Sequence, residues 1–208
     1  MTAAEAKKQK WNRIYTDSGS AEPQACGILE AHLRLLEPAG GSALDLACGR
    51  GGNALLLARV GFKVTALDIS DVVIDQLQRR ARLEKLPLDA QVADLEAPAR
   101  LSAVAGPFNV VTVSDYLSRD LCRFIPSVMA AGGLLFYETF VREKTQPSAG
   151  PSNPGYLLKS NELLDLFGSL RVLVFSDLSQ IGDWNFGLRN KSALIAVKSA
   201  GNAATGEE

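Results

Sequence analysis

The chain has 208 residues, 47% of them apolar, and a formal net charge of −1 at pH 7. The apolar content is enough for a full hydrophobic core. The chain has no excess of basic residues, on which nucleic-acid binding depends. No apolar run approaches 18 residues and the three cysteines show no metal-ligand spacing. We therefore expect no membrane span, no metal site, and a cytoplasmic protein with reduced thiols.

The first 40 residues are predicted to form two helices that cap the rest of the chain. The first covers residues 3–15 and carries Trp11 and Tyr15 four positions apart on one face. After a loop, residues 24–36 repeat apolar side chains at helical spacing and predict a second helix. Because the two aromatic residues share a face just before a loop, we expect the first helix to act as a lid.

The next stretch has the pattern of a nucleoside-binding unit. Residues 43–46 are a short apolar run, as expected of a strand buried on both faces. A glycine-rich turn follows and leads into an apolar helix over residues 54–58. Residues 63–67 form the next strand, with Asp68 at its carboxyl end. An acid about 20 residues beyond such a turn typically accepts hydrogen bonds from ribose hydroxyls.

The turn itself indicates which nucleoside is bound. Dinucleotide loops usually read G-x-G-x-x-G, whereas residues 45–51 read D-x-A-x-G-x-G and lack the third glycine. S-adenosylmethionine has no pyrophosphate for a helix N-terminus to bind. It carries an ammonium and a sulfonium group, and a carboxylate such as Asp45 suits that positive end. The pattern resembles motif I of the class I S-adenosylmethionine-dependent methyltransferases.

Two later strands add candidate cofactor contacts. A helix is predicted over residues 71–85 and a third strand over residues 88–93, which ends at Asp94 and Leu95. The resemblance implies that this pair meets the adenine, with the carboxylate accepting from the amino group. A short helix or loop at residues 97–104 precedes the fourth strand. The cofactor-binding residues that the resemblance implies are Asp45, Ala47, Gly49, Gly51, Asn53, Asp68, Ile69, Asp94, Leu95 and Ser114.

The second half of the chain continues the alternation of strand and helix. Residues 145–155 hold three prolines and two glycines, so they predict a long loop above the strand ends, where α/β enzymes keep substrate contacts. The last two strands are joined by a short link that favours an antiparallel pair. The predicted strands here are 108–113, 134–138, 170–177 and 192–198, and the predicted helices are 119–129 and 158–167.

This element order resembles the seven-stranded sheet of the class I methyltransferases. It implies an α/β, Rossmann-like three-layer sandwich whose sheet is mostly parallel, with the last strand antiparallel. Residues 41–198 would form the cofactor-binding domain, residues 1–40 its cap, and residues 199–208 a disordered tail. The spacing of Trp11 and Tyr15, the turn, and residues 137–140 are similar to the bacterial branch around the tellurite-resistance methyltransferases.

Tyr15, Tyr116 and Arg189 are the candidate catalytic residues. The tellurite-resistance enzymes use histidine and arginine on the approach to the last strand; this chain has no histidine there, and Arg189 is the candidate for the arginine role. A soft acceptor such as a thiol or chalcogen needs no general base, whereas a hydroxyl or amine does. Asp115, Glu138 and Arg142 are further candidates at the strand ends, and Asp115 is expected to touch the cofactor together with Ser114.

The sequence thus predicts an S-adenosylmethionine-dependent methyltransferase for a small-molecule acceptor, with a soft chalcogen or thiol nucleophile as one option. Two other classes remain open. One is a NAD(P)-type oxidoreductase, against which Asp45 and the missing glycine argue. The other is a non-catalytic binding module with the same fold, because fold alone does not fix function. Neither nucleic acid nor membrane is expected as a partner, and the protein is predicted to be a monomer or homodimer.

Overall fold

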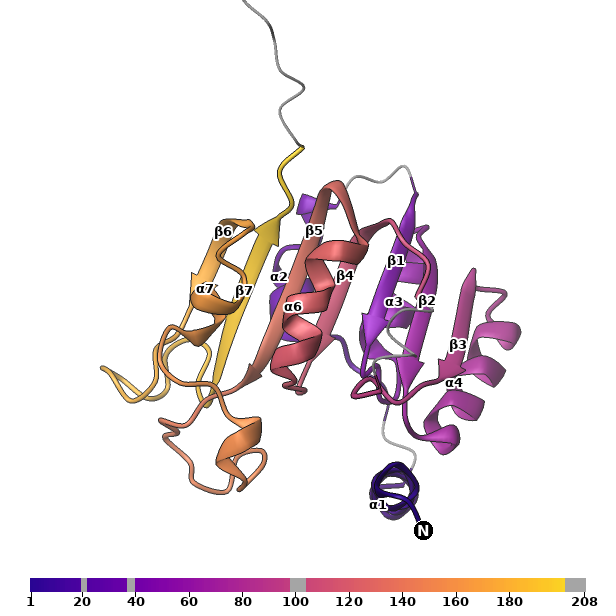
Figure 1. Cartoon of the computed structure of the whole chain (residues 1–208), viewed down its shortest axis with the longest axis horizontal. Helices are drawn as coiled ribbons and strands as arrows, with labels where there is room; N and C mark the ends of the chain where they lie inside the picture. Colours follow the sequence, from indigo (N-terminus) through magenta and orange to yellow (C-terminus); the bar gives the residue numbers. More distant parts are fainter. Residues whose placement is uncertain (20–21, 37–39, 98–103, 201–208) are drawn as a thin grey trace, which may run out of the picture.

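A seven-stranded sheet forms the centre of the computed structural model, which describes residues 1–19, 22–36, 40–97 and 104–200 (Figure 1). The strand order is β3-β2-β1-β4-β5-β7-β6. The first five strands are parallel, while β7 runs antiparallel to both β5 and β6. The predicted fold class is therefore confirmed. The strands are β1 Ser42–Leu46, β2 Lys63–Asp68, β3 Leu88–Val92, β4 Phe108–Ser114, β5 Met129–Phe140, β6 Arg171–Ser176 and β7 Lys191–Val197.

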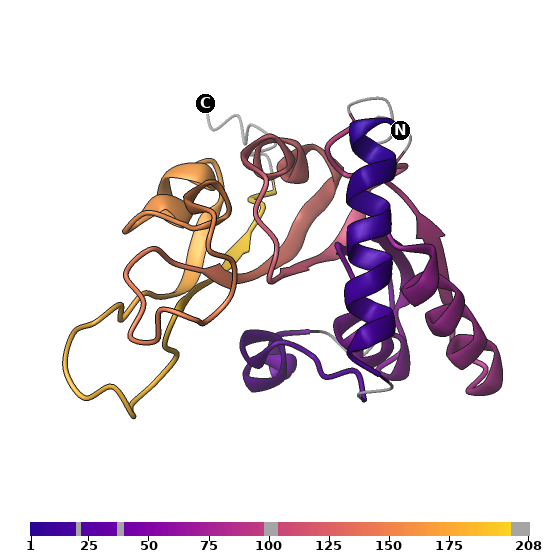
Figure 2. The same ribbon diagram turned by 90° about the horizontal axis from the view of Figure 1, so that it is seen from below.

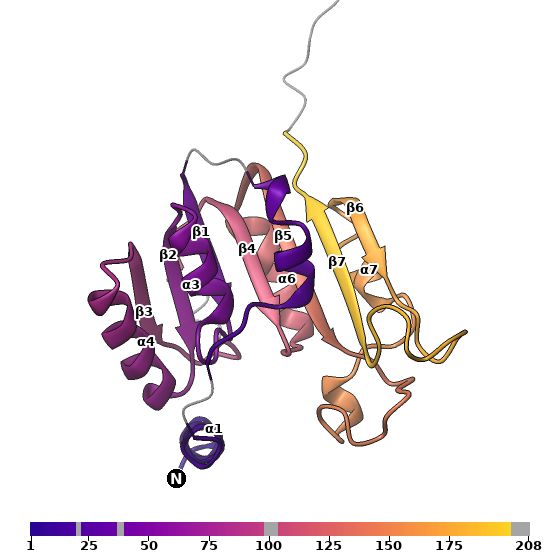
Figure 3. The ribbon, with the colours of Figure 1, turned by 180° about the vertical axis from the view of Figure 1, so that it is seen from behind.

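Helices cover both faces of this sheet. Helices α2, α3 and α4 lie on one face and α6 and α7 on the other, as Figures 1 and 3 show from opposite sides. Within the described residues, no helix is long and apolar enough to cross a membrane. The helices are α1 Ala3–Asp17, α2 Gly27–Ala31, α3 Gly52–Arg59, α4 Asp71–Leu83, α6 Arg119–Val128 and α7 Glu162–Leu166, with 3-10 turns η1 Leu33–Leu35 and η2 Pro154–Tyr156.

The alternation of side chains along β1 explains the two layers. Leu44 and Leu46 are fully buried and pack in one hydrophobic cluster with Ile125 of α6. Ala43 points to the opposite face and packs in a second cluster with Leu55 of α3. Successive residues of a strand point to opposite faces, so a central strand covered on both sides must be apolar throughout.

The helix predicted over residues 24–36 is shorter and broken in the structure. Its first residues are extended, because the amide of Cys26 donates to Asn53 Oδ1 at 2.8 Å. The amide of Ile28, at the start of α2, donates to Glu138 Oε2 at 3.1 Å. These two distant side chains fix where the helix begins, and no local periodicity could have shown them.

Two other boundaries also differ from prediction. β5 starts at Met129, before the predicted 134–138, because its first residue pairs with Phe108 ahead of an irregularity in which β5 carries the extra residues. Helix α7 is shorter than the predicted 158–167, since Leu158 forms a bridge with Val141. The predicted segment 97–104 and most of the predicted tail fall outside the described residues.

Helix α1 lies outside the three layers and crosses the carboxyl ends of the central strands (Figures 1 and 2). It begins with a capping box in which Thr2 and Glu5 satisfy each other's backbone amides. None of its 15 described residues is buried. Because burial of apolar area supplies most helix stability in proteins, the position of α1 must depend on polar contacts.

Arg189 organises the connection between β6 and β7. Its side chain donates to five backbone carbonyls of this one loop, at distances of 2.5 to 3.2 Å. The indole of Trp184 also donates to Gln180 O at 3.0 Å. The planar, forked guanidinium suits several acceptors at once, so this loop is built around one side chain. The carbonyls belong to Leu178, Ser179, Ile181, Asp183 and Phe186.

We predict that Arg189→Ala makes this loop sensitive to limited proteolysis and lowers the melting temperature while cofactor affinity is unchanged. Five carbonyls would lose their donor in the loop. Arg189→Lys should rescue the loop only in part, because an ammonium group has three donors and no fork. A variant with an intact loop and lost turnover would instead support the catalytic role predicted from the sequence.

Candidate functional site

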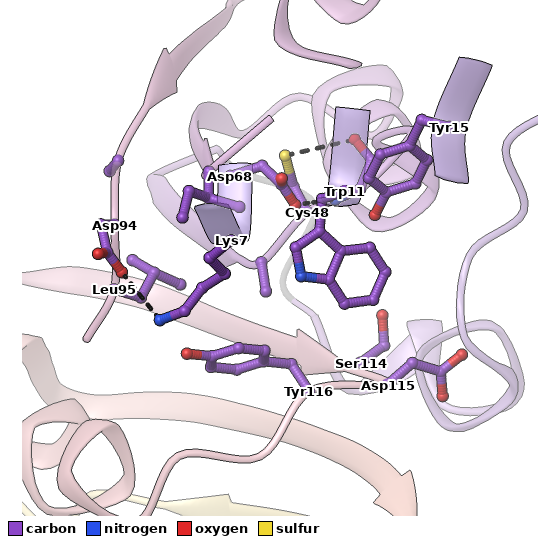
Figure 4. A pocket seen from close by; sticks show the side chains of 14 residues that line it. Lys7, Trp11, Tyr15, Cys48, Asp68, Asp94, Leu95, Ser114, Asp115 and Tyr116 are labelled. Atoms are coloured by element: carbon purple, nitrogen blue, oxygen red, sulfur yellow. Dashed lines mark hydrogen bonds and ion pairs between the residues drawn. The ribbon is translucent and has the colours of Figure 1, made fainter. Parts of the chain in front are cut away.

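A cavity of about 330 Å³ opens at the carboxyl ends of β1, β2 and β4, beneath α1. Small-molecule sites commonly measure about 300–1,000 Å³ and lie at this edge of open α/β sheets. Figure 4 shows Trp11 and Tyr15 over the cavity, with Asp94 on one side and Asp115 on the other. The lining residues are Lys7, Trp11, Tyr15, Ala47, Cys48, Gly49, Asp68, Ile69, Ala93, Asp94, Leu95, Ser114, Asp115 and Tyr116.

The buried carboxylate of Asp45 braces the turn that follows β1. One oxygen accepts from Thr112 Oγ1 of β4 at 2.8 Å, and the other from the amide of Ala54 in α3 at 3.1 Å. Burial raises the pKa of Asp45 to about 7, against the opposing effect of its hydrogen-bond donors, including Asn53. The described residues that line the cavity do not include Asp45. It lies beneath the turn, and its contact with a cofactor stays a prediction from the sequence.

The turn itself has the left-handed backbone conformations that glycine allows. Gly49 has φ of 52° and Gly51 has φ of 83°. A Cβ atom on Gly51 would clash with Leu77 of α4, whereas one on Gly49 would lie 3.0 Å from the Tyr15 hydroxyl. Gly51 therefore serves the packing of α4, and Gly49 leaves its backbone open to the cavity and to α1.

Asp68 ties the turn to the end of β2. One carboxylate oxygen accepts from the amide of Gly49 and the other from the amide of Ser70, both at 2.9 Å. Burial raises the pKa of Asp68, although these amides act in the opposite direction. The side chain still lines the cavity. The residue predicted to bind ribose therefore also braces the backbone of the turn.

Polar contacts hold α1 across the cavity. Lys7 Nζ lies 2.6 Å from Glu96 and 3.7 Å from Asp94, in the segment after β3. Asn12 donates to Asp71 at 2.8 Å and accepts from Ser70 Oγ at 2.6 Å. At the other end of the helix, Arg50 of the turn donates to the Tyr15 carbonyl and to Ser18 Oγ, each at 2.9 Å. A fourth contact is the ion pair of Lys8 and Asp71 at 2.6 Å. Helix α1, which the sequence predicts to be a lid, thus forms the upper wall of the cavity.

The side of the cavity formed by β4, β5 and β7 carries a charged cluster. Lys191, the first residue of β7, lies 2.7 Å from Asp115 and 3.0 Å from Glu138. Tyr116 lines the cavity next to Asp115, and burial raises the pKa of its hydroxyl, as it does for Tyr15. The sequence analysis missed Lys191, because only the antiparallel pairing of β5 and β7 brings it to this edge.

The structure brings most of the predicted site residues to this cavity. Asn53 lies behind its wall, where its Nδ2 donates to Ser114 Oγ at 3.1 Å. Arg189 is held in the loop between β6 and β7 and, like Asp45, Gly51 and Asn53, is not among the described residues that line the cavity. Predicted residues that do line it are Tyr15, Tyr116, Ala47, Gly49, Asp68, Ile69, Asp94, Leu95 and Ser114.

Residues 43–132 match the family described as "Methyltransferase domain", which covers β1 to the start of β5. Over this segment, which is less than half of the chain, the protein is similar to a methyltransferase domain. The match supports S-adenosylmethionine, the cofactor predicted from the sequence. Among the described residues, no group of three or more histidine, cysteine, aspartate or glutamate side chains could hold a metal ion.

Two curated proteins are similar to this part of the chain. A ubiquinone biosynthesis O-methyltransferase of Xanthomonas axonopodis pv. citri is 31% identical over 112 residues, 51% of this chain and 46% of that protein. The S-adenosyl-L-methionine-dependent Diels-Alderase iccD of Talaromyces variabilis is 40% identical over 124 residues, 56% and 42% of the two chains. The chain therefore spans less than half the length of these curated relatives.

The fold as a whole resembles a solved tellurite-resistance-type structure. TehB from Haemophilus influenzae aligns with a TM-score of 0.64 at 19% identity, over 91% of this chain and 67% of TehB. An identity this low supports the shared fold alone. The resemblance to the TehB branch that the sequence predicted is confirmed at that level.

We predict that Asp68→Ala raises the dissociation constant for S-adenosylmethionine at least about tenfold, measured by calorimetry. Charge-assisted hydrogen bonds to ribose are worth about 1.5–3 kcal/mol, and about 1.4 kcal/mol corresponds to one decade. The melting temperature should fall as well, because the amides of Gly49 and Ser70 lose their acceptor. Asp68→Asn should do less harm to both. Unchanged affinity in Asp68→Ala would contradict this placement of the cofactor.

Proposed function

We propose that the chain transfers the methyl group of S-adenosylmethionine to a small-molecule acceptor. The observation that carries this proposal is the cavity that α1 covers. Asp68 and Asp94, which the sequence predicts to bind the cofactor, line one side of it. Asp115 and Tyr116 line the other side. The near-neutral net charge of the chain favours a small acceptor over nucleic acid.

The chain's own residues fit this cofactor. The cavity volume of about 330 Å³ is suited to a nucleoside with an amino-acid tail. Asp68 can accept from the ribose hydroxyls and Asp94 from the adenine amino group, while Leu95 offers an apolar surface for the ring. The open backbone at Gly49 leaves room for the methionine part beside the turn. When bound, the cofactor supplies a sulfonium-activated methyl group.

The rest of the chemistry is alignment and exclusion of water. Holding two reactants in line can supply roughly 7–11 kcal/mol of the barrier. Trp11 and Tyr15 of α1 cover the cavity and would keep water from the reacting atoms. Tyr116 would contact the acceptor from the side of the cavity opposite α1. Its hydroxyl faces Lys7 in Figure 4. Arg189 has no part in this mechanism, since its donors are taken within its own loop.

Two chemical classes of acceptor are compatible with this site. A thiol or a soft chalcogen, the option predicted from the sequence, would need only alignment. A hydroxyl acceptor would need a proton acceptor. The relative named for ubiquinone biosynthesis is an O-methyltransferase, which supports the second class.

The proposal is tested by binding and by methyl transfer. Calorimetry should show binding of S-adenosylmethionine and S-adenosylhomocysteine and none of NAD. Label from methyl-labelled cofactor should then appear in a thiol, selenite or phenol and not in RNA. NAD binding alone would favour the oxidoreductase reading. Cofactor binding without transfer to any acceptor would favour a role like that named for the Diels-Alderase relative. Efficient, salt-sensitive methylation of RNA would contradict a small acceptor.

We predict that deleting residues 1–18 lowers turnover more than it lowers the melting temperature. None of the described residues of α1 is buried, so its loss removes little apolar burial, whereas the cavity loses Lys7, Trp11 and Tyr15. Activity and thermal unfolding of the truncated and full chains provide the comparison. A stably folded truncation with full turnover would rule out a lid.

A further inference from the structure

Asp115 stands apart from the acids assigned to the cofactor. Asp68 and Asp94 follow β2 and β3, whereas Asp115 follows β4, on the other side of β1 in the sheet. In Figure 4, the indole of Trp11 lies between Asp94 and Asp115. In the arrangement proposed above, the ribose and adenine lie over β2 and β3. Asp115 therefore faces the end of the cavity that is left for the acceptor.

A buried partner fixes the position of Lys191 next to Asp115. Lys191 Nζ contacts Glu138 Oε1 at 3.0 Å, and Glu138 is only 3% exposed. The other oxygen of Glu138 accepts from the amide of Ile28, so this carboxylate is fully engaged. Burial alone would lower the pKa of Lys191, but Asp115 and Glu138 outweigh it and the pKa is raised. The ammonium charge therefore persists and balances one carboxylate.

Asp115 keeps the unbalanced negative charge of this cluster. Its side chain is 52% exposed and lines the cavity, in contrast to the buried Glu138. It has φ of 57°, a left-handed conformation that aspartate and asparagine tolerate better than most residues. Lys191 Nζ lies 2.7 Å from Oδ1 of Asp115. This contact holds the carboxylate at the edge of the cavity, and its exposure leaves acceptor capacity for a ligand.

The surroundings of Asp115 are aromatic. Trp11 and Tyr15 of α1 have ring centroids 5.8 Å apart, and Tyr116 follows Asp115 in the chain. All three side chains line the cavity. Aromatic rings favour stacked or edge-to-face contact with another ring. An acceptor with an aromatic ring and a hydroxyl group fits both the rings and the carboxylate.

We propose that Asp115 accepts the proton of a phenolic acceptor during methyl transfer and that Lys191 is the residue that positions it. A lone pair of the phenol oxygen forms the new O–C bond, the C–S bond breaks with its electrons retained by sulfur, and the O–H proton passes to the Asp115 carboxylate. The products are the methyl ether and S-adenosylhomocysteine, and the proton then leaves to water. This inference rests on the proposed function and names its acceptor class.

The test compares Asp115→Asn with the parent protein on phenol and on 4-nitrophenol at mildly alkaline pH. Asparagine tolerates the backbone conformation, so the variant should fold. General-base catalysis is worth about 100-fold or more, and kcat for phenol should fall by that factor. The fall should be about tenfold or less for 4-nitrophenol, which is largely ionised and needs no base. A residue with only a structural role would affect both acceptors equally.

Three variants control this comparison. Asp120→Asn removes an exposed carboxylate of α6 and should leave both rates unchanged. Lys191→Met alone would leave Glu138 buried without a countercharge, so the double variant Lys191→Met/Glu138→Gln removes both charges together. It should reduce kcat for phenol more than for 4-nitrophenol. Lys191→Arg should restore part of the rate.

Several outcomes would overturn the inference. Equal losses on the two phenols in Asp115→Asn would contradict a proton acceptor. If Asp115→Asn raises the dissociation constant for S-adenosylhomocysteine tenfold, Asp115 contacts the cofactor instead. Methylation of thiols or selenite but of no phenol would refute the acceptor class while the proposed function stands. Cofactor binding without methyl transfer to any acceptor would refute both.

Discussion

The hydrogen bonds of one buried carboxylate determine the geometry of the site. Asp45 joins the end of β1 to Thr112 of β4 and to the first turn of α3. Because these three elements are fixed relative to one another, the conformation of the backbone between β1 and α3 is restricted, and this turn lies at the cavity. Asp68 then attaches the same turn to β2 through Gly49. The floor of the cavity is therefore rigid, because two acids brace it from two neighbouring strands.

The roof has the opposite physical character. Helix α1 is held by ion pairs and hydrogen bonds through Lys7, Lys8, Asn12 and Arg50, most of them partly exposed to water. Exposed ion pairs contribute about 0–1 kcal/mol each and weaken with salt. A rigid floor with a weakly attached roof suits a site that must admit a cofactor, exclude water and release a product.

Local patterns and distant pairings explain which features could be predicted from the sequence. The turn at residues 45–51 was predictable, because glycine spacing and strand polarity are local properties. The roles of Arg189 and Lys191 were not. A guanidinium can serve a ligand or the carbonyls of its own loop, and the sequence is the same in both cases. Lys191 reaches Asp115 only through the pairing of β5 with β7. The order of the elements predicts that these two strands pair, but it does not predict which residues lie opposite each other.

Because β7 runs in the opposite direction, the proposed acceptor end of the site can change in sequence independently of the proposed cofactor end. The acids proposed to bind the cofactor follow parallel strands, whereas Lys191 begins a strand and comes two residues after Arg189, the centre of the β6–β7 loop. A change in that loop would alter the chain next to Lys191 without altering β1, β2 or β3. Acceptor preference could therefore drift through insertions in a peripheral loop while the cofactor half of the sheet stays under separate selection.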